Sequence, residues 1–476
     1  MRIAAFVIVP LAALAAWLWM QPGDQFATPF EEPGYRSYLS SLIYDEFDLA
    51  AMSLRGLNAV RGRQAGLLDQ PFDYKDECFQ EKLLTSPPLN DRYFLEYPHA
   101  ALLLFRAGWW FQPEIQQMPI SGGVLDCDYH NLVLHQPETP EEQKLWRGFV
   151  LASRCYVFVM VLCLFALIAV LEWGYGAGTN LQGGALMLLL PASLLFTLNR
   201  YDVIPALFTA ISFACLGRGW RRSSAIALGL GVLFKVYPIL FAPFILRYLW
   251  SDRRAALRWF TALTATGALA FLPMLFGADL EAVMGPYRFQ LTRPPEIGLT
   301  IYGFLLPEAA AGGIIGTAFR LGVLGLAIAL LLIQPITSIA SILRRSAVVL
   351  IIFVSLAVFY SPQWVLWFAP LLLPLIGQSR RLGWTVATLD VVTYLTFPVW
   401  FWLAAPVGYW LLKENGHWNL YLYWIVGGSL RAARFIVCAA LVWHLLQLEF
   451  PKLLIRAWLA KYVAPTLAGV FTRKPV

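Results

Sequence analysis

Three carboxylates lie close together in the sequence Tyr44-Asp45-Glu46-Phe47-Asp48, near the start of a long polar stretch. A carboxylate held beside a membrane-bound substrate can act as a general base, because it takes the proton from a hydroxyl group as that hydroxyl attacks. The alternative is a solvated, acidic helix start, since Asp and Glu favour the first turn of a helix. Taken alone, this fragment favours the helix start.

A second candidate lies where the polar stretch meets an apolar segment, at Glu96-Tyr97-Pro98. Proline is common at the first position of a helix, so Tyr97-Pro98 can simply begin one. Glu96, together with Tyr97, can instead line a binding site. The residues themselves leave both interpretations open.

Lys235 is the most informative charge, because it lies in an apolar run at the sequence Lys235-Val236-Tyr237-Pro238. A cation at the centre of a bilayer costs about 2.5 to 3.5 kcal/mol on insertion scales and is retained mostly for function. A backbone break at membrane depth is tolerated only where it is buried in protein or lines a wet cavity. Snorkelling to the interface is the alternative. We predict that Lys235 and Tyr237 line a cavity that binds a phosphate or pyrophosphate.

Further charges are expected at the same membrane surface. Arg200 and Asp202 mark a tight turn between two apolar segments and could simply pair with each other. Arg293 and Glu296 lie in a later loop, where a basic residue runs against the bias of positive charge toward the cytoplasm. An anionic ligand at the outer surface would account for it.

The remaining polar candidates carry weaker signals. Gln363, in another turn, could bond sugar hydroxyls, although a turn amide is the commoner explanation. His417 is a candidate proton or phosphate partner, and Arg431 and Arg434 could be structural snorkelling residues. No pair of histidines has metal-ligand spacing on one helix face, and no phosphate-binding Gly-lysine loop is present. The sequence therefore predicts neither a metal nor a cofactor.

Composition identifies the elements that must position these residues. Of the 476 residues, 59% are hydrophobic and 14% charged, whereas an ordinary soluble protein is about 25% charged. The apolar residues come in runs long enough to cross a bilayer as helices. The net charge of +7 is dispersed between these runs, so membrane topology explains it better than nucleic-acid binding does.

Charge also predicts the topology. Residues 21–148 hold 19 of the 29 acidic and 10 of the 36 basic residues, whereas the later short loops carry clusters of arginine. Because cytoplasmic loops are enriched in Lys and Arg, we expect residues 21–148 to form a large first exoplasmic loop and both termini to be cytoplasmic. The clusters are Arg218, Arg221 and Arg222; Arg247, Arg253, Arg254 and Arg258; Arg344 and Arg345; and Arg380 and Arg381.

The expected fold is an all-α polytopic membrane protein with about twelve transmembrane segments in a single membrane-embedded domain, residues 1–476. A helical bundle, 149–449, follows the exoplasmic loop, and 450–476 form a cytoplasmic tail. Residues 98–111 are expected to form a re-entrant or membrane-surface helix. The segments are 3–20, kept as an uncleaved anchor, 149–171, 183–198, 203–217, 225–234, 237–250, 259–276, 313–334, 346–360, 364–377, 384–405 and 431–449.

The six cysteines contain no C-x-x-C pair or zinc spacing. Cys78 and Cys127 share the exoplasmic loop and could form a disulfide. The other four lie in apolar runs and are expected to pack as small hydrophobic residues: Cys155, Cys163, Cys215 and Cys438.

Together these fragments resemble the polyprenol-phosphate-mannose-dependent glycosyltransferases of the C-type membrane superfamily, such as the phosphatidylinositol-mannoside mannosyltransferases. The resemblance rests on Asp48-Leu49 followed by Gly62, on the later Glu96-Tyr97-Pro98, and on the order of the motifs at Lys235, Arg293 and Ser361-Pro362-Gln363. It spans about residues 44 to 370. Met52 and His99 depart from the family pattern, which has Tyr and a second Pro at these positions.

The resemblance implies a multi-pass protein of the plasma (inner) membrane whose active site faces the periplasm or exterior. Asp48 would be the general base, with Asp45 the second choice. A sugar, with mannose favoured, would pass with inversion from a polyprenyl-phosphate donor to a lipid or glycan hydroxyl. Lys235, Arg293 and Arg200 would stabilise the leaving phosphate.

Two other classes of function remain open from the sequence. Broken helices and intramembrane charges also mark transporters, so the chain could be a transporter or flippase of a lipid-linked or anionic solute. The large acidic loop and the lack of evident inverted halves count against this. A polymerase or ligase of surface polysaccharide, using a lipid-diphosphate donor, is the other alternative.

Overall fold

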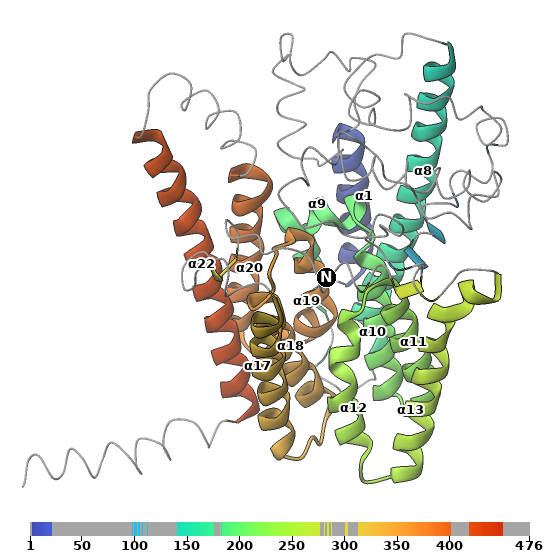
Figure 1. Ribbon diagram of the computed structural model, residues 1–476, viewed down its shortest axis with the longest axis vertical. Coiled ribbons are helices and arrows are strands. Elements are labelled where there is room, and N and C mark those ends of the chain that lie inside the picture. The colour runs from blue at the N-terminus through green and yellow to red at the C-terminus, as the bar shows by residue number, and fades with distance from the viewer. Residues whose placement is uncertain are drawn as a thin grey trace, which may run out of the picture.

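The computed structural model describes residues 2–20, 140–175, 181–276 apart from residue 182, 313–400 and 418–450, with a few residues between 98 and 112 and between 280 and 302. Every element in these described ranges is a helix (Figure 1). The all-α class expected from the sequence is therefore confirmed for this part of the chain.

The described ranges contain α-helices together with short 3₁₀ and π-helical segments. The α-helices are α1 (Arg2–Met20), α8 (Pro140–Ala169), α9 (Pro191–Asn199), α10 (Val203–Gly217), α11 (Arg221–Phe234), α12 (Ala242–Leu249), α13 (Arg253–Gly267), α17 (Gly313–Ile333), α18 (Ile339–Ser355), α19 (Val365–Leu372), α20 (Arg380–Tyr394) and α22 (Trp418–Glu449). The 3₁₀ segments are η2 (Ala185–Leu189), η3 (Tyr237–Phe241), η4 (Ala268–Phe276), η6 (Pro362–Trp364) and η7 (Leu373–Gln378), and π-helices cover η1 (Val170–Gly174) and η8 (Leu395–Trp400).

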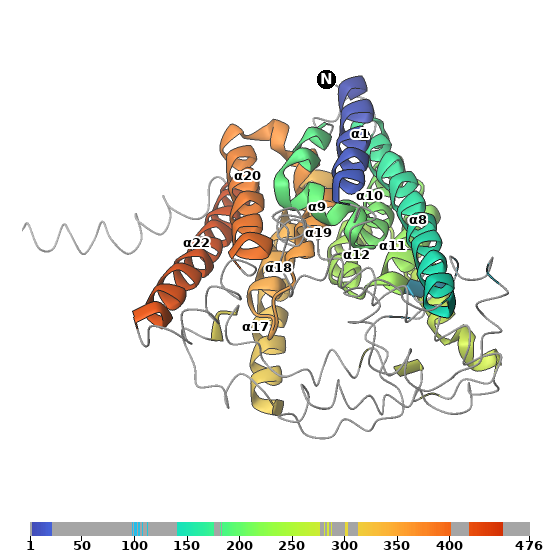
Figure 2. The ribbon, with the colours of Figure 1, turned by 90° about the horizontal axis from the view of Figure 1, so that it is seen from above.

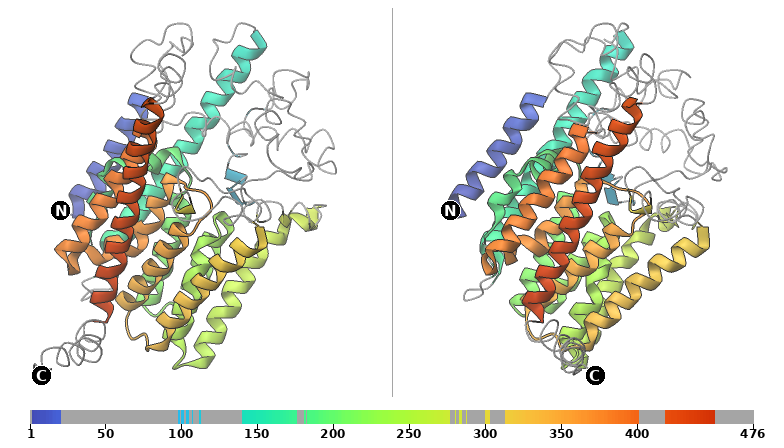
Figure 3. Two further views of the ribbon diagram at one scale, coloured as in Figure 1. Left: turned by 60° about the vertical axis from the view of Figure 1, so that its left-hand side comes forward. Right: turned by 90° about the vertical axis from the view of Figure 1, so that its left-hand side faces the viewer.

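Four stretches of described helix are long and apolar enough to cross a membrane: Arg154–Gly174, Arg253–Leu272, Ile315–Ile333 and Ile425–Glu449. A fifth crossing would result if Pro191–Leu198 and Val203–Gly217, which are bent by 104°, form one span. The views in Figures 2 and 3 show the longer helices running alongside one another. The structure thus supports a helical membrane protein, whereas the twelve crossings remain a prediction.

Two apolar runs contain short α-helices that 3₁₀ turns extend. The α12 and α19 helices have eight residues each, but η3 runs directly into α12, and η6 and η7 join the two ends of α19. The combined helix Tyr237–Leu249 is still shorter than a crossing, because about 20 helical residues are needed to span a hydrocarbon layer about 30 Å thick. Proline explains where the 3₁₀ turns occur around α19, because Pro362 begins η6 and Pro374 is the second residue of η7.

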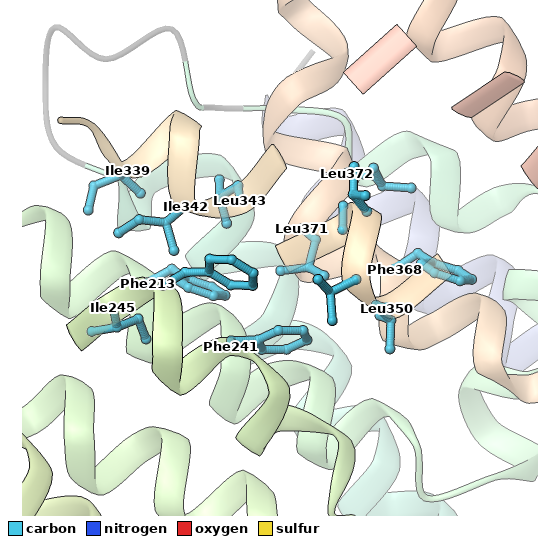
Figure 4. Packing of buried hydrophobic residues seen from close by; sticks show 14 of the residues in the cluster. Phe213, Phe241, Ile245, Ile339, Ile342, Leu343, Leu350, Phe368, Leu371 and Leu372 are labelled. Carbon is cyan, nitrogen blue, oxygen red and sulfur yellow. The ribbon is translucent and has the colours of Figure 1, made fainter. Parts of the chain in front are cut away.

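A hydrophobic core joins α10, η3, α12, α18 and α19 (Figure 4). Phe213 and Phe241 pack with ring centroids 6.0 Å apart, and Ile342 and Leu371 are fully buried in the same cluster. A second cluster packs α1, α8 and α9 against the first half of α10. Because α10 contributes to both clusters, its ends hold fixed positions relative to α11 and α19.

Loops that the charge bias predicts to be cytoplasmic lie at one end of the bundle. Arg221, at the start of α11, forms an ion pair of 2.7 Å with Asp252, the residue before α13. The backbone N–H of Ala255, together with the Arg221 guanidinium, holds the pKa of Asp252 below its ordinary value. Arg344 donates to Gln378 in the turn before α20, at 3.0 Å.

The N-terminus belongs to the same end. Arg2 lies 4.0 Å from the carboxylate of Glu172, in the π-helical turn that follows α8. The next residue, Trp173, accepts a hydrogen bond of 3.0 Å from Arg218, which begins the turn between α10 and α11. These contacts agree with the expectation that the N-terminus and the arginine loops share one side of the membrane.

The structure corrects the predicted environment of Arg344 and Arg345. They were expected in a short loop before a segment at 346–360, but α18 begins at Ile339 and includes both. Both guanidinium groups bind the carboxylate of Glu449, at 2.8 and 2.7 Å. Arg345 also donates to the carbonyl oxygens of Leu331 and Gln334 at the end of α17, so it caps that helix.

We expect Glu449→Gln to destabilise the protein by about 3 to 5 kcal/mol, because it leaves buried guanidinium groups without their carboxylate. The free energy of unfolding would be measured by denaturant titration in detergent micelles. The control is Arg221→Gln, whose ion pair with Asp252 is about half exposed on both sides and should matter little. Equal effects of the two substitutions would contradict the assigned role of Glu449.

Candidate functional site

The α10 and α11 helices form an antiparallel hairpin, and its end opposite the Arg218–Arg221 turn brings two charges together. Asp202 is the residue before α10, and Lys235 is the residue after α11. The Lys235 ammonium lies 2.7 Å from Oδ1 of Asp202. The carboxylate has no exposed surface, whereas 13% of the Lys235 side chain is exposed.

Aromatic side chains enclose this ion pair. The indole Nε1 of Trp367, in the first turn of α19, donates to the same Asp202 oxygen at 2.5 Å. The Lys235 ammonium also lies 4.8 Å from the ring centroid of Tyr201 and 5.3 Å from that of Trp367. Tyr237 stacks on Trp367, with centroids 4.3 Å apart and ring planes 7° from parallel. We call these five residues the Lys235 cluster.

The break after α11 creates this arrangement. The helix ends at Phe234, Lys235 takes an extended conformation, and the chain resumes as η3 at Tyr237 and Pro238. The break predicted at this sequence is therefore confirmed. It turns the lysine toward α10 and α19, while Tyr237 packs between Trp367 and Phe241.

The cluster offsets most of the cost of burying a lysine. Inserting an ammonium group at the centre of a bilayer costs about 2.5 to 3.5 kcal/mol. A desolvated cation–π contact stabilises the ammonium by up to about 2 kcal/mol. The Asp202 carboxylate supplies the opposite charge. Its second oxygen, Oδ2, is buried and has no hydrogen-bond partner in the described part of the chain. The carboxylate therefore keeps one oxygen available to a further donor.

The structure brings together three residues that the sequence predicted for the site, namely Asp202, Lys235 and Tyr237. Arg200 is buried in the bend between α9 and α10, two residues from Asp202. Asp202 forms its ion pair with Lys235, a contact that the sequence did not predict. Gln363 is buried in η6, one turn before Trp367, and its Oε1 has no partner among the described residues.

The other predicted residues lie outside the described ranges. Their distances from the Lys235 cluster therefore remain untested: Asp45, Asp48, Glu96, Tyr97, Arg293, Glu296 and His417, together with Cys78 and Cys127. Within the described ranges, no three His, Cys, Asp or Glu side chains gather closely enough to hold a metal ion.

Sequence reasoning missed Tyr201 and Trp367. Trp367 lies in an apolar run, where a tryptophan is expected to be ordinary core packing. Its spacing of four residues from Gln363 was the available signal, because positions i and i+4 share a helix face. The sequence contained no signal for Tyr201 other than its position between the charged residues Arg200 and Asp202.

The cluster has the donors and surfaces that a sugar phosphate requires. An ammonium has three N–H donors, so Lys235 can bind Asp202 with one and an oxyanion with another. Asp202 thus positions the lysine without using all its donors. The aromatic rings add flat apolar surface beside the charge.

We expect strong coupling between Asp202→Asn and Lys235→Met. Each single substitution leaves an unpaired polar or charged group in the interior, whereas the double variant removes both charges. The coupling in a double-mutant cycle of unfolding free energies should be about 1 to 3 kcal/mol. The matched cycle is Asp252→Asn with Arg221→Gln, an exposed pair that should show no measurable coupling. Additive effects at Asp202 and Lys235 would contradict the pairing.

Comparison with known proteins gives no independent assignment for this site: no protein-family model and no curated protein matches the chain.

Proposed function

We propose that the chain is a membrane glycosyltransferase that moves a sugar, with mannose favoured, from a polyprenyl-phosphate donor to a lipid or glycan hydroxyl. The reaction occurs at the membrane surface away from the cytoplasm and inverts the anomeric centre. The observation that carries this proposal is the Lys235 cluster, in which a partly exposed ammonium lies among aromatic rings. The cluster lies at the end of the α10–α11 hairpin opposite the arginine turn.

In the proposed reaction, a carboxylate removes the proton of the acceptor hydroxyl as its oxygen attacks the anomeric carbon. The bond from that carbon to the phosphate oxygen breaks, and the electron pair leaves with polyprenyl phosphate. Asp48 is the proposed base and Asp45 the second choice. Lys235 stabilises the charge that the phosphate gains, an interaction that strengthens as the bond breaks and therefore accelerates the reaction.

Asp202 has a supporting role in this scheme. A lysine side chain has four rotatable bonds and would otherwise sample many positions. The ion pair with Asp202 and the rings of Tyr201 and Trp367 restrict the position of its ammonium group. Such restriction means that little reorganisation is needed when the phosphate becomes more negative. The Gln363 Oε1 atom has no partner within the described ranges, so it is a candidate acceptor for a sugar hydroxyl.

A transporter of an anionic solute is the second candidate, favoured by the 104° bend between α9 and α10 and by the break after α11. The two functions differ in covalent chemistry. A transferase releases polyprenyl phosphate and forms a new glycoside, whereas a transporter leaves the donor intact. Complete absence of sugar transfer from any lipid donor, with solute movement across proteoliposomes, would establish the transporter instead.

The first test concerns the base. Purified protein given polyprenyl-phosphate mannose and membrane acceptors should release polyprenyl phosphate, and Asp48→Asn should lower the rate by about 10²- to 10⁴-fold. Asp45→Asn is the matched control in the same acidic segment and should have a much smaller effect. If Asp45→Asn alone abolishes turnover, the base assignment passes to Asp45, whereas normal turnover in both variants rules out this pair.

The second test concerns the leaving phosphate. Lys235→Met should lower kcat by about 10²- to 10³-fold, the loss usual for one stabilising donor in a low-dielectric site. Lys235→Arg should recover little, because a planar guanidinium does not match the position of a compact ammonium between Tyr201 and Trp367. Size-exclusion profiles and melting temperatures above the assay temperature serve as the control for folding. Wild-type kcat in folded Lys235→Met would remove Lys235 from the mechanism.

A further inference from the structure

Four exposed arginines stand at the starts of α11 and α13, and their guanidinium groups have no acceptor in the described part of the chain. Two neighbouring arginines are engaged, because Arg218 donates to the carbonyl oxygen of Trp173 and Arg221 pairs with Asp252. The four that make no such contact are Arg222, Arg253, Arg254 and Arg258. Their charges are therefore available to a partner outside the protein.

The two helices that carry these arginines lie side by side (Figure 1). Trp259 of α13 is fully buried between them and donates to the hydroxyl of Ser224 in α11 at 3.2 Å. The ion pair between Arg221 and Asp252 joins the starts of the two helices. Together they form one surface, with six arginines against one carboxylate and a net charge of +5. We call it the basic patch: Arg218, Arg221, Arg222, Arg253, Arg254 and Arg258, with Asp252.

Helix stability does not explain the charge of the basic patch. A cation at the start of a helix opposes the helix dipole, which favours negative charge there. Both helices nevertheless begin with an Arg-Arg pair, and neither has an acidic residue in its first turn. The charge bias of membrane loops explains why arginines lie at this end of the bundle. It does not require four of them to gather on two adjacent helices without a counter-charge.

Large apolar side chains border the basic patch on the outer surface. Trp220 and Trp250, in the turns that lead into the two helices, are 57% and 56% exposed. Leu257 and Phe260 are 65% and 50% exposed and follow Arg253 by four and seven residues, so they share its face of α13. One apolar stretch long enough to cross a membrane begins at Arg253 itself. Since tryptophan concentrates at the depth of lipid headgroups, the arginines lie at headgroup depth and the apolar side chains at the depth of the acyl chains.

We propose that the basic patch binds the headgroup of an anionic phospholipid in the leaflet at this end of the bundle. Guanidinium groups bind phosphate through paired hydrogen bonds, and the acyl chains of the same lipid pack against Leu257 and Phe260. An acidic protein surface would match the charge, but it would leave these exposed apolar side chains without a function.

The bound lipid is not a substrate of the proposed reaction. The α11 helix separates the basic patch from Lys235, and its 14 residues extend about 21 Å at about 1.5 Å per residue. The lipid instead neutralises the repulsion among the arginines and holds the starts of α11 and α13 at the membrane surface. This inference does not depend on the proposed function.

The test measures binding of dioctanoyl phosphatidylglycerol to the purified full chain in nonionic detergent, by native mass spectrometry. The double variant Arg222→Gln/Arg254→Gln should weaken binding about 30-fold, because each arginine near an anionic lipid surface contributes about fivefold. The corresponding double substitution by lysine should keep most of the affinity, since it keeps the charge. The matched control is Arg380→Gln/Arg381→Gln, which removes two exposed arginines from the start of α20 and should have less than about a fifth of that effect.

The choice of probe distinguishes the lipid from other anions. Dioctanoyl phosphatidylcholine, with the same acyl chains and no net charge, should bind much more weakly than dioctanoyl phosphatidylglycerol. Glycerol phosphate that binds as tightly, with the same dependence on Arg222 and Arg254, overturns the lipid assignment and supports a free anion. A polyglutamate peptide that binds more tightly than the lipid supports an acidic protein partner instead.

Two further results would remove the site. One is equal binding of dioctanoyl phosphatidylglycerol to the wild type and to the folded glutamine double variant. The other needs no variant, because raising the salt concentration from about 50 mM to about 500 mM screens exposed charges. The preference of the wild type for phosphatidylglycerol over phosphatidylcholine should then largely disappear, and a preference that salt leaves unchanged contradicts a site made of exposed arginines.

Discussion

The Asp202 carboxylate is completely buried, and a charge in that position must keep an opposite charge beside it. Lys235 provides that charge, and Trp367 donates to the same oxygen. One carboxylate therefore links the start of α10, the end of α11 and the first turn of α19. The broken chain after α11 has no regular helix to hold it at that point. Its position depends on this pair and on the rings packed around it.

Backbone N–H and C=O groups at helix ends also need partners inside a bilayer, because no water is available there. The N-terminus of α9 is satisfied by Asp390 of α20, which accepts from the backbone N–H groups of Ala192 and Ser193 at 2.8 and 2.9 Å. The C-terminal carbonyls of α17 are satisfied by Arg345. In both cases a charged side chain of another helix takes the place of water. The bundle can therefore contain a short helix such as α9 without leaving the N–H groups at its start unpaired.

The sequence predicted the helical class, the break at Lys235 and the common end of the arginine loops, since each follows from a strong local signal. Hydropathy detects burial in lipid, proline marks a break, and arginine clusters mark one side of the membrane. It did not predict that α18 begins early enough to include Arg344 and Arg345, because their partner Glu449 is distant in sequence. The role of Trp367 was missed for a similar reason. A tryptophan in an apolar run gives no local sign that it donates to a carboxylate on another helix.

The contact between Arg345 and Glu449 also bears on how the chain assembles. Glu449 follows Arg345 by 104 residues, so α18 is synthesised and reaches the membrane before its acidic partner exists. Until α22 is present, Arg345 can bind the carbonyl oxygens at the end of α17 but lacks its carboxylate. The last described helix therefore completes a network of contacts between helices that are synthesised well before it.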